Sequence, residues 1–265
     1  MTDEPKIRLG GMALRNGVLV HSHGHWAAAV RTPDGAIHVG SGRKPELPGR
    51  LTSTPMLRGV VRLTEAVLLL PVVRTNVPEA RLPMEGAPAT AAVAAVTIGS
   101  RLLRRSGRSP VLVETLTAGL SVLPAAAALR SSQLARYHGA EHKAIGGYEQ
   151  DREARLVSKE HERCGSHMVG PMLLATAAAN AAVAAASPKP RPAARALASL
   201  AAMGAATEAF GWMTRNGDHP LARLLARPGH ALQRFASTRE PDAEELEVAQ
   251  AAVDEVLRLE HAAAA

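Results

Sequence analysis

The segment MVGPMLLATAAANAAVAAAS (residues 168–187) indicates the fold class, because it predicts one long apolar helix. Its length is close to the roughly 20 residues that cross the hydrocarbon core of a bilayer. Alanine supplies most of its apolar side chains, and alanine is nearly neutral for membrane insertion, unlike leucine, isoleucine, phenylalanine and valine. The segment therefore fits either a membrane span or a buried helix in a soluble alanine-rich bundle.

Two other segments repeat this pattern. They are SPVLVETLTAGLSVLPAAAAL (109–129) and ARALASLAAMGAATEAFGWM (194–213), and both reach spanning length. The connection SPKPRPA (187–193) is short, so segments 168–187 and 194–213 are expected to form an antiparallel helical hairpin. Glu208 interrupts the second segment, where a carboxylate is costly in a membrane unless it faces a functional interior.

The sequence divides into three parts around these helices. Residues 1–50 alternate short apolar runs with the turn Pro33-Asp34-Gly35, which predicts a small β-hairpin region. Residues 51–240 hold the helical core, and residues 241–265 predict an amphipathic helix with Asp242 as its N-cap. We therefore expect a mainly α fold, an alanine-rich multi-helix bundle that spans the membrane, with a soluble bundle as the alternative.

Composition narrows the classes of partner. The chain of 265 residues carries a net charge of +7, but only 2% of its residues are aromatic, so little is available to stack on bases. Nucleic acid is therefore not an expected partner, and the lipid bilayer is. Cys164 is the only cysteine, which excludes an intrachain disulfide, and the polar start MTDEPKIRLGG does not predict a cleavable signal peptide. Lys and Arg are frequent in the loop 130–167 and in the C-terminal tail, which predicts that both are cytoplasmic.

The segment YHGAEHKA (137–144) carries the pattern H-x-x-E-H, formed by His138, Glu141 and His142. At 100° per residue the two histidines lie 40° apart and one turn along one helical face, where they can bind the same metal ion. The glutamate lies close enough to act on a bound water without binding the metal, as in metallopeptidases of this motif. The ordinary alternative is a helix whose histidines cap its start or face solvent.

A metal site of this kind needs a third ligand, and four residues are candidates. Glu208 would lie near the cytoplasmic end of its helix if the hairpin spans the bilayer. Glu149 returns to the same face as the histidine pair, but Gly146-Gly147 is expected to end the helix before it. His161 and Cys164 have the H-x-x-C spacing of a chelating loop.

A second group of histidines lies in HSHGH, where His21, His23 and His25 alternate. On a strand they would point to one face, as a pair of metal ligands does. Gly24 and the nearby turn weaken the strand prediction, so we interpret this group as a surface histidine cluster.

Ordered motifs along the chain resemble the YqhQ-type family, an uncharacterised bacterial group described as predicted metal-dependent enzymes. They are GG-x-A…GV from Gly10, P-x-x-RGV from Pro55, RYHGAEHKAI…YE at 136–149, H-x-RCG at 161–165, E-A-F…TRN around Glu208 and RPG…Q…STREPDAEELEVA at 227–249. The chain departs from the family at Met12 and Asn16, where relatives have glutamine and glutamate, so a role for an N-terminal acid or amide is in doubt here.

The resemblance implies a multi-pass bacterial membrane protein with one joint site. That site would contain His138, Glu141, His142, His161, Cys164 and Glu208. The leading hypothesis is a membrane-embedded metal-dependent hydrolase, using Zn²⁺ as the divalent metal, whose substrate the sequence does not indicate. His138 and His142 would bind the metal, Glu208 would be the third ligand with His161 or Cys164 as substitutes, and Glu141 would be the general base.

The alternative hypothesis is a non-enzymatic membrane scaffold or regulator with a structural metal. It would use the same histidine pair together with His161 and Cys164, which fills four positions and leaves none for water.

Overall fold

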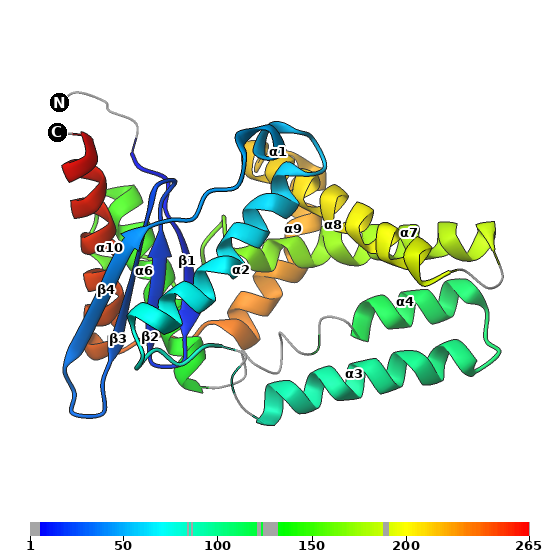
Figure 1. The fold of residues 1–265 in the computed structure, drawn as a ribbon, viewed down its shortest axis with the longest axis horizontal. Coiled ribbons are helices and arrows are strands. Elements are labelled where there is room, and N and C mark those ends of the chain that lie inside the picture. Colours follow the sequence, from blue (N-terminus) through cyan, green and yellow to red (C-terminus); the bar gives the residue numbers. More distant parts are fainter. Residues whose placement is uncertain are drawn as a thin grey trace.

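The structure is a computed structural model that describes residues 6–83, 85, 87–120, 123, 132–187 and 191–264. Figure 1 shows a sheet covered by helices beside a second group of helices that projects away from it. Most of the predicted apolar segment beyond residue 120, and residues 188–190 of the expected hairpin connection, lie outside the described residues.

The N-terminal region is larger than the expected hairpin, because its four strands form one antiparallel sheet in chain order. Arg15 and Asn16 make the tight turn between the first two strands, and Gly35, with a φ of 89°, supplies the turn between the last two. The strands are β1 (Gly10–Leu14), β2 (Gly17–His21), β3 (His25–Arg31) and β4 (Ile37–Arg43).

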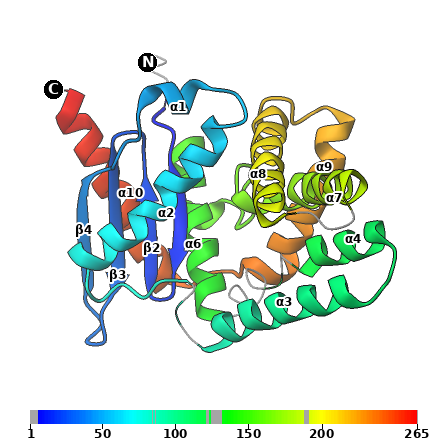
Figure 2. The same ribbon diagram turned by 45° about the vertical axis from the view of Figure 1, so that its right-hand side comes forward.

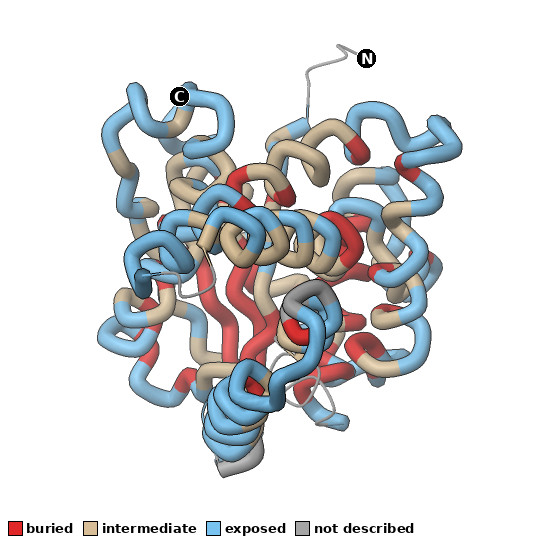
Figure 3. Tube along the Cα trace, turned by 90° about the vertical axis from the view of Figure 1, so that its right-hand side faces the viewer, coloured by how far each residue is buried: buried red, intermediate tan, exposed pale blue. Residues whose placement is uncertain are grey.

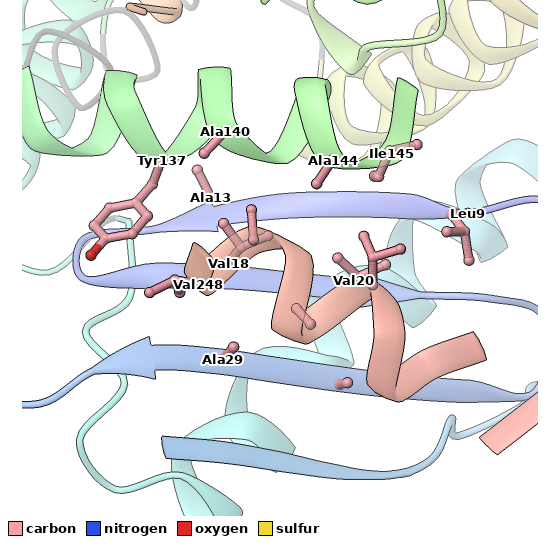
Figure 4. Packing of buried hydrophobic residues seen from close by; sticks show 14 of the residues in the cluster. Leu9, Ala13, Val18, Val20, Ala29, Tyr137, Ala140, Ala144, Ile145 and Val248 are labelled. Atoms are coloured by element: carbon pink, nitrogen blue, oxygen red, sulfur yellow. The ribbon is translucent and has the colours of Figure 1, made fainter. Parts of the chain in front are cut away.

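Helices cover both faces of this sheet. On one face, α6 (Ser132–Gln150) lies over β1 and α10 (Ala243–Ala264) lies over β2 and β3, as Figure 4 shows. The other face packs on α2 (Arg58–Asn76). The apolar face of the predicted C-terminal helix is therefore buried against the sheet, in one core with α6. Members of that core labelled in Figure 4 are Leu9, Ala13, Val18, Val20, Ala29, Tyr137, Ala140, Ala144, Ile145 and Val248.

The second group of helices contains the predicted apolar segments. Its α7 (Val169–Ala186) and α8 (Pro192–Arg215) pack side by side, as expected for the hairpin (Figures 1 and 2). Beside them lie α3 (Ala87–Arg105), α4 (Pro110–Leu120) and α9 (Pro220–Leu232). Short turns complete the chain: α1 (Gly49–Ser53), η1 (Ala154–Leu156), η2 (Gly165–Met168) and the π-helical η3 (Gln233–Ser237).

The mainly helical class is confirmed, but the expected set of several membrane spans is not found. Among the described residues, one helix, Gly165–Ala186, is long and apolar enough to cross a membrane. Only 11% of its most apolar stretch is buried, and Figure 3 shows buried residues gathered on the strands while much of the helical surface is exposed. The predicted span 194–213 lies in α8, which Arg195 and Glu208 interrupt, and it is not such a helix.

The expected break at Gly146-Gly147 is wrong, since α6 continues to Gln150. Both glycines instead let the following loop approach the helix. A Cβ at Gly146 would lie 2.8 Å from Cγ1 of Val157, and one at Gly147 would lie 2.9 Å from the carbonyl oxygen of Arg152. Tertiary packing therefore explains these glycines better than their low helix propensity does.

We predict that Glu255, which attaches α10 to β4, stabilises the fold in a pH-dependent way. Its carboxylate accepts hydrogen bonds from Arg258 and, at 2.6 Å, from Ser41 Oγ, and these bonds lower its pKa from 4.5 to about 2. Because the folded pKa lies below the unfolded one, this stability is complete above pH 4.5 and is lost as the pH falls towards 2. Glu255→Gln should therefore lower the free energy of unfolding by about 1 kcal/mol at neutral pH and by nothing near the acid limit.

Urea denaturation across that pH range measures the effect, and Glu247→Gln on the same helix is the matched control. The Glu247 carboxylate is 66% exposed in its pair with Arg31 and should matter less. Equal pH dependence of the two variants would show that the Glu255 contacts do not stabilise the docking of α10.

Candidate metal centre

The middle of α6 lines a cavity of about 450 Å³ between β1 and the loop that follows α6. His138, Glu141 and His142 all face it, together with His161 and Cys164 from that loop. The sequence motif therefore lies on one helical face, as its spacing predicts. Apolar side chains line much of the remaining wall: Leu9, Met12, Leu134, Ile145, Val169 and Leu232.

Backbone carbonyls fix the orientation of both motif histidines. His138 donates its Nδ1–H to the carbonyl oxygen of Ser237 at 2.8 Å, and His142 donates its Nδ1–H to that of Lys159 at 2.7 Å. Each imidazole is thereby held in the tautomer that leaves Nε2 without a proton. Burial also lowers the pKa of His142 well below its usual value, so its ring is neutral. A neutral imidazole with a carbonyl behind it is the usual form of a metal-binding histidine.

Cys164 completes a group of three donor atoms. Its Sγ lies 3.5 Å from Nε2 of His138, and the donor atoms of His138, His142 and Cys164 all lie within 4.8 Å of one another. Ligands at about 2.0–2.3 Å from Zn²⁺ are separated by roughly 3.3–3.8 Å in a tetrahedral site. The N–H of Ser166 donates to Sγ at 3.5 Å, which holds the thiol at the start of η2. The donor set fits one metal ion after small shifts.

Glu141 lies beside this group without belonging to it. Its Oε2 is 4.0 Å from Nε2 of His138, and burial raises its pKa to about 7. The carboxylate fits there because residue 11 is glycine: a Cβ on Gly11 would lie 2.6 Å from Cδ of Glu141. The contact between α6 and β1 therefore determines where this carboxylate can be.

His161 faces the cavity with both ring nitrogens already bonded. Its Nε2–H donates to Glu149 at 3.1 Å, and its Nδ1 accepts the N–H of Arg163 at 3.3 Å. The His161 and His142 rings are 5.5 Å apart. Glu149, a sequence candidate for the third ligand, thus orients His161 and also pairs with Arg163.

The structure does not bring Glu208 to the motif. Its carboxylate accepts bonds from Nε of Arg58 at 2.8 Å and from the N–H of Met56 at 3.0 Å, and it is not among the residues that line the cavity. The carboxylate in the apolar helix α8 is therefore satisfied by a guanidinium at the start of α2. A partner 150 positions away in the sequence could not be recognised from local spacing.

The interpretation of HSHGH as a surface cluster is wrong for two of its three histidines. His21 lines the cavity, beside the backbone of Gly10, and sequence analysis missed it as a site residue. His25 pairs with Glu260 of α10 at 2.8 Å, and His23 is exposed. His21 directly follows the apolar run of residues 17–20, and extending the strand by one residue would have placed its side chain on the sheet.

A second group of possible metal ligands lies among the described residues, formed by Glu162, His167 and His230. His167 is already bonded at both nitrogens: Nδ1 faces the carbonyl oxygen of Ala226 at 3.3 Å, and Nε2 faces Nε2 of Gln233 at 2.9 Å. The ring therefore has no free donor atom, and this group fits a hydrogen-bonded support for η2 better than a metal site.

Comparison with known proteins is consistent with the observed motifs. Residues 111–259 match the family model described as "Protein of unknown function (DUF1385)". A stretch of 130 residues is 31% identical to "Uncharacterized protein YqhQ" of Bacillus subtilis (strain 168), which is 47% of this chain and 41% of that relative. The chain thus aligns with less than half the length of this relative, and no solved structure matches. More than half of the sequence, including the whole H-x-x-E-H helix, fits the family model, and the chain belongs to the DUF1385 family of proteins of unknown function.

Proposed function

We propose that this protein is a metal-dependent hydrolase that binds one Zn²⁺ through His138, His142 and Cys164. The observation that carries the proposal is the convergence of one donor atom each from His138, His142 and Cys164 within 4.8 Å, with Nδ1 of both rings held by a carbonyl oxygen so that Nε2 can bind the metal. Two imidazoles and a thiolate suit Zn²⁺ better than a hard cation such as Mg²⁺. Cys164 takes the position that the sequence assigned first to Glu208.

The chemistry divides between the metal and Glu141. Zn²⁺, when bound, activates a water molecule as a Lewis acid. Glu141 accepts the proton of that water, because its carboxylate lies 4.0 Å from a ligand atom and is buried away from bulk solvent. The apolar wall of the cavity limits the access of other water molecules, which strengthens electrostatic interactions inside.

The structural-metal alternative needs a fourth protein ligand. His161 is the nearest candidate, but its two nitrogens are bonded to Glu149 and to the backbone of Arg163. Three ligands with one open position are typical of catalytic zinc sites, whereas four protein ligands are typical of structural ones. The bonded state of His161 therefore favours the hydrolase over the scaffold.

We also propose that the protein associates with the bilayer through α7. The helix Gly165–Ala186 has spanning length and little burial, and Leu174 on it is 62% exposed. Cys164 immediately precedes this helix, so the metal site would lie at the membrane surface. The loop 132–167 and the C-terminal part of the chain pack together through α6 and α10, so both would lie on the same side of the bilayer and α7 would enter it without carrying the rest of the chain across. Their Lys and Arg content favours the cytoplasmic side.

Metal analysis of purified variants tests the ligand set. The wild-type protein should contain about one zinc per chain, and Cys164→Ala and His142→Ala should each weaken zinc binding by at least about tenfold. Glu208→Gln is the matched control and should keep its zinc, because its partner is Arg58. Loss of zinc from Glu208→Gln with retention in Cys164→Ala would restore the ligand set expected from the sequence.

Glu141→Gln tests the catalytic assignment, since it removes the base and keeps the shape of the side chain. It should retain zinc and lose about 10²–10⁴-fold in hydrolysis, the usual contribution of a general base. Rates are measured on a panel of fluorogenic amides, peptides and esters, with Glu153→Gln at an exposed position as control. A zinc-loaded wild-type protein that hydrolyses nothing in the panel would favour the structural-metal alternative.

Alkylation of Cys164 tests the environment of the third ligand, and the single cysteine makes the readout unambiguous. Burial raises the pKa of this thiol, and the thiolate is the reactive form. Metal-free folded protein should therefore react with iodoacetamide at least about tenfold more slowly at neutral pH than protein in urea. Zinc should slow the folded reaction further, and mass spectrometry follows it. No effect of zinc would argue against Cys164 as a ligand.

A further inference from the structure

Strand β1 leaves one edge of the sheet without a strand partner among the described residues. It pairs with β2 on its other side, so alternate residues direct their N–H and C=O groups towards the free edge. Arg15 shows which residues direct their backbone groups to the free edge, because its N–H points away from β2 and donates to the carbonyl oxygen of Arg81. Gly11 and Ala13 belong to the same set, and neither N–H has a hydrogen-bond partner on that side within the part of the chain that the structure describes.

The cavity follows this edge. It contacts Gly10, Gly11, Met12 and Ala13 in succession. Side chains alternate between the two faces of a strand, and Ala13 packs on the α6 side while Met12 packs on the α2 side. Because the cavity touches residues from both faces of the sheet, it passes along the edge of β1 and does not lie over one face only. Gly11 is exposed, so its backbone is accessible, whereas Ala13 is buried and is reached only through the cavity that it lines.

The edge lies directly beside the candidate chemistry. Gly11 faces Glu141 at the distance that excludes any larger residue, and His138 and His142 line the same cavity from α6. A chain that paired with β1 would therefore have its backbone carbonyls next to the donor atoms and the base. The apolar wall opposite would take apolar side chains from alternate positions of that chain.

On this basis we propose that the substrate of the hydrolase is an extended polypeptide segment that adds to the sheet as a strand beside β1. The backbone groups of Gly11 and Ala13 would hold it, and the proposal rests on the hydrolase function proposed above. The water oxygen bonds to the peptide carbonyl carbon and the C–N bond breaks. Glu141 accepts one proton from the water and passes it to the leaving nitrogen, and the second water proton stays on the new carboxyl group, so the products are one carboxylic acid and one amine.

Binding is tested with the full-length Glu141→Gln protein, which cannot cleave the probe. The probe is a fluorescein-labelled peptide of alternating valine and threonine with terminal lysines, and its matched control carries an N-methyl group on every residue. The control keeps all side chains but has no backbone N–H on either edge with which to pair with β1. Fluorescence anisotropy should show at least about tenfold weaker binding of the methylated peptide. Equal binding of the two peptides would overturn the proposal.

Hydrogen exchange of the same complex provides a second measurement that needs no change in the fold. With the unmodified peptide, the amides of Gly11 and Ala13 should exchange at least about tenfold more slowly, because they become hydrogen-bonded. Those of Gly10 and Met12 should not change, since β2 already pairs with them. Protection of all four amides alike, or of none, would contradict pairing at this edge.

The outcomes separate this proposal from the hydrolase itself. Tighter binding of the unmodified peptide than of the methylated one, together with no hydrolysis by the zinc-loaded wild type, would support the β1 edge as a polypeptide site and reject the hydrolase. Hydrolysis of small esters or amides without discrimination between the two peptides would keep the hydrolase and reject the polypeptide substrate.

Discussion

The close contact of α6 with β1 is the constraint on which the rest of the site depends. Gly11 and the small side chains Ala140 and Ala144 let the helix approach the edge strand, and a larger residue at position 11 would displace Glu141. This approach places the H-x-x-E-H face of α6 against a strand whose outward N–H groups at Gly11 and Ala13 have no hydrogen-bond partner among the described residues. The same contact therefore buries the base, forms the cavity and exposes the edge to it.

Segments far from α6 in the sequence then fix its side chains. The carbonyl of Ser237 orients His138 across 99 residues, and that of Lys159 orients His142 across 17. Ser237 lies in the π-helical turn that precedes α10, and α10 packs on the sheet through the core it shares with α6. Docking of the C-terminal helix and orientation of these two candidate ligands are thus parts of one arrangement, and loosening either affects the other.

The sequence predicted what depends on local spacing. The helices of the hairpin, the strands before residue 50 and the common face of His138 and His142 all follow from periodicity or turn chemistry. Contacts between distant segments were not predictable. The Glu208 carboxylate accepts a hydrogen bond from Arg58 and so lies away from the motif, and Nε2 of His161 is bonded to Glu149. The helix α6 continues through Gly146 and Gly147 because the following loop packs closely against both. Each of these was decided by a partner that no local pattern identifies.

The exchange of Glu208 for Cys164 changes the proposed ligand set and gives a stronger reason for the Zn²⁺ already expected from the sequence. Two imidazoles and a carboxylate also suit Mn²⁺ or Fe²⁺, whereas a thiolate selects a softer cation and favours Zn²⁺. The charge at the site is the same in both cases, because each anionic ligand contributes one negative charge beside two neutral rings. With the proposed Zn²⁺ bound, a single positive charge would remain on the ion, next to the carboxylate of Glu141. This charge would stabilise the buried carboxylate, which among the described residues has His138 at 4.0 Å as a partner.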